Sequence, residues 1–254
     1  MSKWWEESGT VQLNELIDKD VYRMVVYSPR VAKHAVAGQF LMIRPPNCGP
    51  LLPRAMAPIG FDESMGLIDI YYRVVGPGTQ SLRCLTVNEA VTVIGPLGTA
   101  FTDFGRTMAI IGRGVGITPL LPIAAAAYNA GATIRSYLSA RSRPLVLGLA
   151  DFGTLGQTFT QDDESDPGEL ITNALAAHLQ SGYTPDVVVV SGSHRLTAVT
   201  VQLGHEYGFT VWVFVEEKMA CGVGYCKGCA IGPHRMLICT DGPALLSQEV
   251  SLRE

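Results

Sequence analysis

Four cysteines near the end of the chain have the spacing of a metal-binding loop. Cys221, Cys226 and Cys229 lie in the segment CGVGYCKGC, with gaps of four and two residues, and Cys239 follows after nine more residues. A [2Fe-2S] cluster needs four thiolates that converge on two irons, and these gaps let one tight loop carry three of them. A structural zinc site favours paired Cys-x2-Cys knuckles on both sides, so the spacing favours the cluster over zinc. The loop also contains three glycines that would let its backbone turn closely around sulfur, namely Gly222, Gly224 and Gly228.

A glycine-rich turn in the middle of the chain could hold a nucleotide phosphate. The strand-like run MAIIG leads into GRGVGITP, which contains Gly112, Gly114 and Gly116. Glycines allow close approach of the backbone, and a helix with Thr118 as its N-cap and the next proline as its first residue would offer free amides. The spacing departs from G-x-G-x-x-G because Ile117 occupies the last glycine place. On its own, the turn fits an ordinary strand-to-helix connection equally well.

A second glycine turn, GPGT, contains Gly78 and Thr79 and follows the strand-like run IDIYYRVV. A second phosphate could sit there, with Arg54 as a fixed cation beside it. An arginine is more often a surface residue, and Tyr71 and Tyr72 fit ordinary strand packing as well as a face that stacks on a flavin.

The pattern of strand-like and helix-like runs divides the chain into three regions. Residues 1–102 contain short β-rich runs between turn clusters, which predicts antiparallel strands in a small barrel or sandwich. In residues 103–216, strand-like runs alternate with helix-like segments such as GELITNALAAHLQ, which predicts a parallel sheet with crossover helices. The acidic run at 161–166 reads as a solvated loop. Residues 217–254 have little regular pattern but hold the clustered cysteines.

Composition predicts a compact cytoplasmic protein. Of 254 residues, 47% are hydrophobic and 17% charged, and the net charge is −4 with scattered Lys and Arg, so no basic stripe for nucleic acid is present. The acidic start MSKWWEESG does not resemble a signal peptide. The most apolar stretch, 115–127, is broken by two prolines and is shorter than the ~20 residues of a membrane span. In such a protein, crowded cysteines favour metal binding over disulfides. The histidines show no ligand spacing, and nothing supports hydrolysis.

With this order of regions, the sequence resembles the electron-transfer subunits of dihydroorotate dehydrogenase, within the ferredoxin reductase superfamily. YYRVVGPGTQSL is similar to the flavin-phosphate segment of that family, IGPLGTAF to its interdomain element and IIGRGVGITPLL to its nicotinamide-nucleotide loop. EEKMACGVGYCKGCAI and ICTDGPAL resemble its cluster-binding tail. The resemblance implies an antiparallel FAD-binding β-barrel at 1–102, a parallel-sheet α/β NAD(P)-binding domain at 103–216 and a [2Fe-2S] subdomain at 217–254.

The implied function is that of an oxidoreductase subunit that passes electrons between NAD(P)H, FAD, the cluster and a partner catalytic subunit. No residue need act as an acid or base, because the cofactors carry the chemistry. The predicted FAD contacts are Arg54, Ala55, Met56, Ala57, Tyr71, Tyr72, Arg73, Gly78 and Thr79. The predicted nucleotide contacts are Gly112, Gly114, Gly116 and Thr118. The predicted cluster ligands are Cys221, Cys226, Cys229 and Cys239.

Three departures from the family pattern indicate a divergent paralogue that serves an oxidoreductase outside pyrimidine synthesis. The flavin motif of the family runs arginine, proline, an aromatic or apolar residue, then serine or threonine, whereas this chain has Arg54-Ala55-Met56-Ala57, so Ala57 offers no hydroxyl to the isoalloxazine. Arg113 stands where the family usually has glycine. Ser191-Gly192-Ser193 replaces the usual Cys-Gly-Pro.

Two other functions fit the same residues. One is a reductase of the NAD(P)H:ferredoxin type, either stand-alone or associated with a hydrogenase or transhydrogenase. The other is a non-enzymatic redox or nucleotide sensor, which the missing hydroxyl at Ala57 keeps open. The resemblance slightly favours NADH over NADPH, although Arg141 and Arg143 follow the second strand of the α/β region, where a 2′-phosphate could be met.

Overall fold

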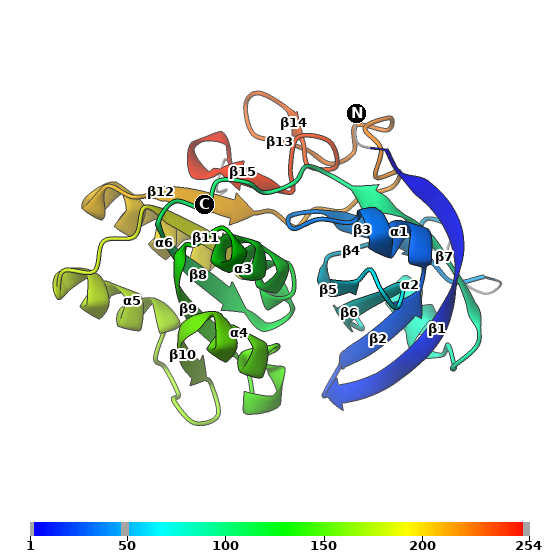
Figure 1. Cartoon of the computed structure of the whole chain (residues 1–254), viewed down its shortest axis with the longest axis horizontal. Coiled ribbons are helices and arrows are strands. Elements are labelled where there is room, and N and C mark those ends of the chain that lie inside the picture. The colour runs from blue at the N-terminus through cyan, green and yellow to red at the C-terminus, as the bar shows by residue number, and fades with distance from the viewer. Residues whose placement is uncertain (1–2, 47–50, 251–254) are drawn as a thin grey trace.

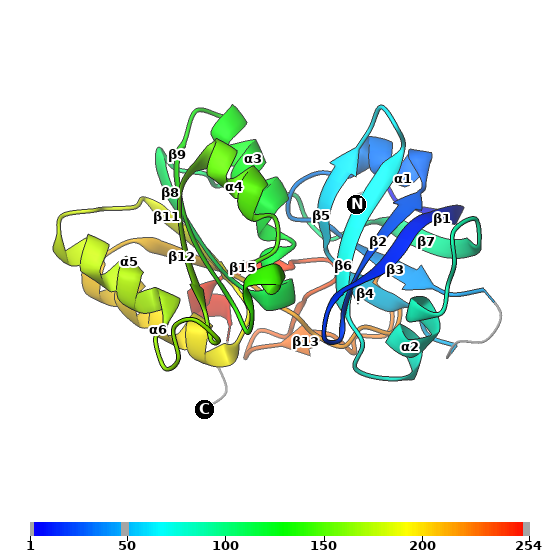
Figure 2. The same ribbon diagram turned by 90° about the horizontal axis from the view of Figure 1, so that it is seen from below.

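The computed structural model describes residues 3–46 and 51–250, and it consists of two sheets that lie side by side with the cysteine-bearing segment along one edge of both (Figure 1). The N-terminal sheet is an antiparallel, nearly closed barrel, and the second sheet is mostly parallel and covered by helices on both faces. The same two bodies and the segment that bridges them are seen from below in Figure 2. The predicted β plus α/β fold is confirmed.

The barrel contains seven strands in the order β4-β3-β7-β1-β2-β6-β5, all antiparallel to their neighbours. Its alternating residues fill the interior, as in β6, where Ile68, Ile70 and Tyr72 are buried and their neighbours are not. Its elements are β1 (Trp5–Asp18), β2 (Val21–Tyr27), α1 (Pro29–His34), β3 (Phe40–Arg44), β4 (Arg54–Met56), β5 (Pro58–Asp62), β6 (Leu67–Arg73), α2 (Pro77–Arg83) and β7 (Ala90–Leu97).

The second sheet has the order β10-β9-β8-β11-β12-β15, and only β15 is antiparallel to its neighbour. Its central strands are buried on both faces because α3 and α4 cover the side toward the barrel while α5 and α6 cover the other. Its elements are β8 (Thr107–Arg113), α3 (Leu120–Asn129), β9 (Thr133–Ala140), α4 (Leu149–Leu155), β10 (Gly156–Asp162), α5 (Ile171–Gln180), β11 (Val187–Ser191), α6 (His194–Tyr207), β12 (Thr210–Phe214) and β15 (Ala244–Leu246).

The cysteine-bearing segment, residues 215–243, leaves the second sheet after β12 and returns to it at β15, where Phe214 pairs with Ala244. It contains a short hairpin of β13 (Ala230–Ile231) and β14 (Met236–Leu237). Cys229 and Cys239 are buried in a hydrophobic cluster with Met42 and Leu97 of the barrel. The segment therefore packs on both sheets.

Two local predictions are wrong. The 3₁₀ turn η1 (Gly114–Ile117) intervenes after β8, so Pro119 caps α3, and the hydroxyl of Thr118 donates to the carbonyl of Val115 at 2.9 Å instead of capping the helix. The acidic run is not wholly a loop, because Gln161 and Asp162 are the buried end of β10. Among the described residues, no helix is long and apolar enough to cross a membrane.

One hydrophobic core is shared by the two sheets. Val21 and Ile59 of the barrel are buried in the same cluster as Phe152 of α4 and Leu147 just before that helix. Gly148, which has a φ of +65°, lets the chain pass close to Ile59, because a Cβ at this position would lie 3.2 Å from Ile59 Cδ1. Polar contacts at the tip of the β1–β2 hairpin add to this core: Ser142 Oγ donates to Asp18, and Lys19 Nζ lies 2.8 Å from Glu164 Oε1.

Removing the side chain of Ile59 should loosen the contact between the sheets. We expect Ile59→Ala to lower the free energy of unfolding by about 2 kcal/mol or more, because the side chain is 6% exposed and would leave a cavity. The shift of the urea midpoint, followed by circular dichroism, measures this change. Leu16→Ala is the matched control in an exposed barrel position and should shift the midpoint little. Equal midpoints for Ile59→Ala and wild type would contradict the shared core.

Candidate functional site

A cleft of about 570 Å³ lies between the barrel and the second sheet. The predicted flavin residues line its barrel wall, apart from Gly78: Arg54, Ala55, Met56, Ala57, Tyr71, Tyr72, Arg73 and Thr79. The opposite wall includes Val115 and Thr118 after β8 and the stretch from Phe214 to Met219 after β12. The predicted residues are thus brought together, and the sequence did not point to Phe40 or to the stretch after β12, which line the same cleft.

Arg54 lies over the start of α2, where Gly78 leaves room for it. A Cβ on Gly78 would lie only 2.0 Å from Arg54 Nε. Arg54 Nη1 donates to the carbonyls of Leu52 at 2.6 Å and Pro53 at 3.2 Å, and its other N–H groups have no acceptor among residues 3–46 and 51–250. Thr79 Oγ1 shapes the turn by accepting from the amide of Val75 at 2.9 Å. The guanidinium is therefore held in place with donors left for an anion such as a flavin phosphate.

Tyr72 is positioned by a residue that sequence reasoning missed. Its hydroxyl donates to Asn14 Oδ1 at 2.9 Å, and Asn14 Nδ2 donates to the carbonyls of Leu82 at 2.9 Å and Leu85 at 2.8 Å. Burial raises the pKa of Tyr72 and of its half-buried neighbour Tyr71, so both phenols stay neutral. Asn14 thereby anchors β6 to α2 and the turn that follows it from inside the barrel, while Tyr71, on the opposite face of the strand, lines the cleft.

The predicted nucleotide loop divides into two packing glycines and one open glycine. A Cβ on Gly112 would lie 2.8 Å from Ile117 Cγ1, and one on Gly116 would lie 2.8 Å from Gly192 Cα. Gly114 has a φ of +56° and open space where its Cβ would be. Close packing of this loop against Gly192 brings the carboxyl ends of β8 and β11 together, which is where open α/β sheets bind ligands.

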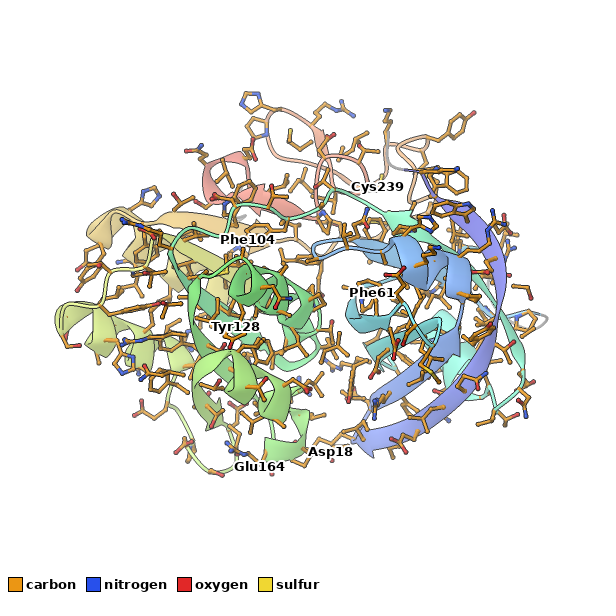
Figure 3. The ribbon with its side chains drawn as sticks, in the orientation of Figure 1. Asp18, Phe61, Phe104, Tyr128, Glu164 and Cys239 are labelled. Carbon is orange, nitrogen blue, oxygen red and sulfur yellow. The ribbon has the colours of Figure 1, made fainter. Side chains whose placement is uncertain are left out.

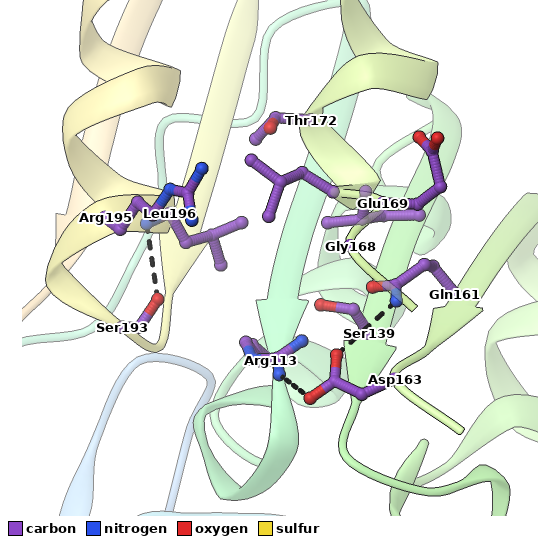
Figure 4. A pocket seen from close by; sticks show the side chains of 12 residues that line it. Arg113, Ser139, Gln161, Asp163, Gly168, Glu169, Thr172, Ser193, Arg195 and Leu196 are labelled. Carbon is purple, nitrogen blue, oxygen red and sulfur yellow. Dashed lines mark hydrogen bonds and ion pairs between the residues drawn. The ribbon is translucent and has the colours of Figure 1, made fainter. Parts of the chain in front are cut away.

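A second pocket of about 290 Å³ opens at these strand ends (Figure 4). Its lining includes Arg113 from β8, Ser139 from β9 and Asp163 beyond β10, together with the starts of α5 and α6. Gly112, Gly114 and Gly116 do not line it, so the glycine loop forms its border rather than its wall.

The four clustered cysteines form two neighbouring pairs. The amide of Cys226 donates to Cys221 Sγ at 3.4 Å, and the thiol of Cys229 lies 3.3 Å from that of Cys239. The amide of Gly224 donates to Cys239 Sγ at 3.1 Å. Cys239 is labelled beside the barrel in Figure 3. Four cysteine sulfurs in two pairs, with amides directed at them, are a donor set that fits a [2Fe-2S] cluster.

Left-handed backbone at two of the three predicted glycines produces this loop. Gly222 and Gly224 have φ values of +72° and +78°, and a Cβ on Gly222 would lie 2.7 Å from Met42 Cγ of the barrel. Gly228 is not left-handed, and Lys227 takes that conformation instead, with a φ of +59°. The loop therefore turns tightly while it stays in contact with the barrel.

The electrostatics of the two pairs differ. Burial alone would raise the pKa of the Cys221 thiol. Hydrogen bonds from the amides of Cys226, Val223 and Tyr225 outweigh burial, so the pKa lies below its ordinary value, at about 7. Burial and the contact with Cys229 raise the pKa of Cys239 to about 12. In the part of the chain that the structure describes, no three Cys, His, Asp or Glu side chains are close enough to hold a single metal ion.

Comparisons with known proteins agree with this geometry. Residues 216–251 match the family model of the iron-sulfur cluster binding domain of dihydroorotate dehydrogenase B. The chain is 28% identical to the dihydroorotate dehydrogenase B (NAD(+)) electron transfer subunit of Enterococcus faecalis, over 97% of this chain and 98% of that protein. The identity to the corresponding Geobacillus thermodenitrificans protein is 29%, with the same coverage.

Solved structures give the same picture. A structure of the NADH-dependent reduced ferredoxin-NADP oxidoreductase, studied for flavin-based electron bifurcation, matches with a TM-score of 0.86 and 26% identity over 96% of this chain and 90% of that chain. A cytochrome P450 reductase from Amycolatopsis matches with a TM-score of 0.65 and 20% identity, over 80% of this chain and 66% of that chain, and shows the shared fold.

The barrel, the parallel sheet and the cleft between them define a ferredoxin reductase-like protein. The cysteine segment narrows this class, because it matches the iron-sulfur domain model. The chain is a protein similar to the electron transfer subunits of dihydroorotate dehydrogenase B along nearly its whole length.

Loss of the Arg54 guanidinium should weaken FAD binding. We expect Arg54→Ala to raise the dissociation constant of FAD by about 10-fold to 100-fold, because a charge-assisted hydrogen bond contributes about 1.5–3 kcal/mol. Fluorescence titration of the deflavinated protein measures this constant. Arg44→Ala, at another partly exposed barrel arginine, is the control and should bind FAD as wild type does. Unchanged FAD affinity in Arg54→Ala would place the flavin phosphates elsewhere.

The cysteine pairs predict a specific pattern of metal content. Cys226→Ser should lower iron and acid-labile sulfide per chain severely, because the cluster needs all four thiolates. Colorimetric iron and sulfide assays on anaerobically purified protein measure both. Cys84→Ser is the control, since Cys84 is an exposed thiol at the end of α2. Residue type alone predicts that Cys48 and Cys84 are buried free thiols; Cys84 is exposed, so that prediction is wrong, and Cys48 lies outside the described residues. Zinc without sulfide in the wild type would exclude the cluster.

Proposed function

We propose that the chain is the electron-transfer subunit of a flavin and iron-sulfur oxidoreductase. It would pass electrons between NAD(P)H, FAD, a [2Fe-2S] cluster and a partner catalytic subunit. The observation that carries this proposal is the composition of the cleft. Arg54 of the barrel, Thr118 of the second sheet region and Met219 of the cysteine-bearing segment all line it. Three parts of the chain that sequence patterns assign to three redox groups thus meet at one place.

The residues of the chain supply positions rather than acid-base chemistry. A nicotinamide gives electrons in pairs, a cluster takes them singly, and a flavin exchanges both ways. Arg54 and the α2 turn would hold the flavin phosphates, and Tyr71 would form the aromatic wall, while Tyr72 holds β6 in place from the barrel core. Phe40 lines the cleft and also belongs to the hydrophobic cluster that contains Cys229 and Cys239. Phe40 thus joins the cleft to the apolar cluster that surrounds these two cysteines.

The partner follows from the relatives, which are named as electron transfer subunits. Such a subunit delivers electrons to a catalytic subunit in a heteromer, where the substrate chemistry takes place. The departures at Ala57, Arg113 and Ser191-Gly192-Ser193 support a divergent paralogue that serves an oxidoreductase outside pyrimidine synthesis. We propose the ranges 1–102, 103–216 and 217–254 as the three functional regions.

We further propose NADH as the preferred nucleotide. Arg143 Nη1 donates to Thr160 Oγ1 at 2.6 Å, so this guanidinium is already engaged on β10. The relatives are named for NAD(+), and Arg141, exposed at the end of β9, is the one arginine of the two that could meet the 2′-phosphate of NADPH instead. Comparison of kcat/KM for NADH and NADPH, in wild type and in Arg141→Ala, tests this preference. A strong NADPH preference that the substitution abolishes would overturn it.

The electron route predicts two activities that separate in one variant. Cys226→Ser should keep its FAD and its NADH oxidation with dichlorophenolindophenol, which takes electrons directly from flavin. Electron delivery to the partner subunit, recovered by co-purification from the native organism, should collapse. Absorbance of the dye and turnover of the partner measure the two activities.

Three results would change this conclusion. A variant that keeps FAD, stays bound to the partner and drives its turnover at the wild-type rate would make the cluster structural. A wild-type protein that reduces a free ferredoxin and binds no partner would be a stand-alone reductase. Absence of NADH oxidation with any acceptor would favour the nucleotide sensor.

A further inference from the structure

The side chain of Arg113 enters the pocket at the strand ends. Arg113 is the last residue of β8, next to the open glycine Gly114. Figure 4 shows its guanidinium in the pocket opposite the start of α6, where Ser193 and Arg195 lie. The side chain is 27% exposed, so it is part of the pocket wall rather than a free surface arginine.

Arg113 is held there by Asp163. Arg113 Nη2 lies 2.6 Å from Asp163 Oδ2, which joins the end of β8 to the turn after β10. That turn is itself fixed, because Asp162 Oδ1 accepts from the amide of Ser165 at 2.9 Å and Glu164 pairs with Lys19 of the barrel. Burial raises the pKa of Asp163, but the hydrogen bond from Arg113 lowers it more, so its carboxylate is charged near neutrality.

The pair leaves donors free for a ligand. A guanidinium has five N–H groups, and within the described ranges only Nη2 of Arg113 has an acceptor. The base of the side chain lies close against Gly192, where an added Cβ would be 3.0 Å from Arg113 Cβ. Asp163 thus engages one nitrogen of the guanidinium and leaves Nε and Nη1 unpaired.

The charged side chains around the pocket balance only when Arg113 is present. Arg113 and Arg195 balance Asp163 and Glu169 in its lining. Without Arg113, an anionic ligand would face a net negative wall. The start of α6, a 14-residue helix capped by Ser193, adds backbone amides and the positive end of its dipole on the opposite side.

We propose that Arg113 binds the diphosphate of the nicotinamide nucleotide, and that Asp163 is a positioning residue that orients its guanidinium. This inference rests on the proposed function, since it takes the ligand to be that nucleotide. A loop of glycines offers a diphosphate only backbone amides, whereas an arginine adds a planar pair of donors that matches phosphate oxygens. In this chain, the Arg113 guanidinium would therefore supply phosphate contacts that a glycine loop makes only with backbone amides.

The test compares two ligands that differ in the diphosphate and the second ribose. ADP-ribose carries the diphosphate and the second ribose without nicotinamide, and adenosine carries neither, so calorimetric titration of the purified full chain with both shows whether Arg113 acts on the part of the nucleotide beyond adenosine. Arg113→Gln should raise the dissociation constant of ADP-ribose by about 10-fold to 100-fold and leave that of adenosine unchanged. Arg113→Lys should recover part of the affinity, because it restores charge but not the planar donors. Asp163→Asn should weaken ADP-ribose binding by a smaller factor.

Flavin reduction gives the second readout. In stopped-flow experiments, Arg113→Gln should raise the NADH concentration needed for half-maximal flavin reduction and leave the rate at saturation near that of wild type. Arg44→Gln on the barrel is the charge-matched control for both measurements. Asp163→Asn keeps the test decisive if thermal melting shows that Arg113→Gln does not fold.

The outcomes separate the inference from the proposed function. If Arg113→Gln weakens ADP-ribose and adenosine equally, or weakens neither, the ion pair only ties β8 to the turn after β10 and the inference is wrong. If ADP-ribose binding depends on Arg113 but NADH does not reduce the flavin, the inference stands and the proposed function falls. If NADH reduces the flavin in wild type and in Arg113→Gln with identical concentration dependence, the proposed function stands and Arg113 does not bind the diphosphate.

Discussion

The hydrophobic core shared by the barrel and the parallel sheet is the constraint on which every other feature of the site depends. Val21 and Ile59 are buried together with Phe152 of α4 and Ile117 of η1. Burial of each such side chain contributes about 1.5–3 kcal/mol to the free energy of unfolding. The cleft has walls from both sheets, so it exists only while this core holds them at one angle. A rotation of either sheet would separate Arg54 from Thr118 and open the cleft to solvent.

The other two sites are anchored to that frame from different directions. The cysteine loop rests on the barrel through Gly222, which lies against Met42 and Leu97. The pocket at the ends of β8, β9 and β10 contacts the barrel through Glu164, which neighbours Asp163 and forms a solvent-exposed ion pair with Lys19. The cleft, the cysteine loop and the pocket therefore all contact the barrel. Transfer of electrons between bound redox groups requires such fixed relative positions.

Patterns along the chain predicted the barrel, the parallel sheet and the cysteine loop, because strand periodicity and ligand spacing are local signals. The cap at Thr118 was mispredicted, since a 3₁₀ turn that no local pattern announces comes before α3. β15 was missed because three residues after an irregular segment carry no periodicity. Asn14 and Asp163 act on residues 58 and 50 positions away, and sequence spacing alone does not encode such contacts.

The return of the chain at β15 has an evolutionary consequence. Because Phe214 and Ala244 are paired neighbours, the two ends of the cysteine-bearing segment lie side by side on the edge of the sheet. Insertions with adjacent ends are the kind that a folded host accepts most readily, since its own backbone pairing is preserved. The cysteine-bearing segment has the geometry of an insertion that can be exchanged without unpairing the sheet. A lineage could lengthen it, shorten it or replace it by another electron-carrying unit, and the flavin-type cleft would keep its barrel wall and the part of its other wall that Val115 and Thr118 form.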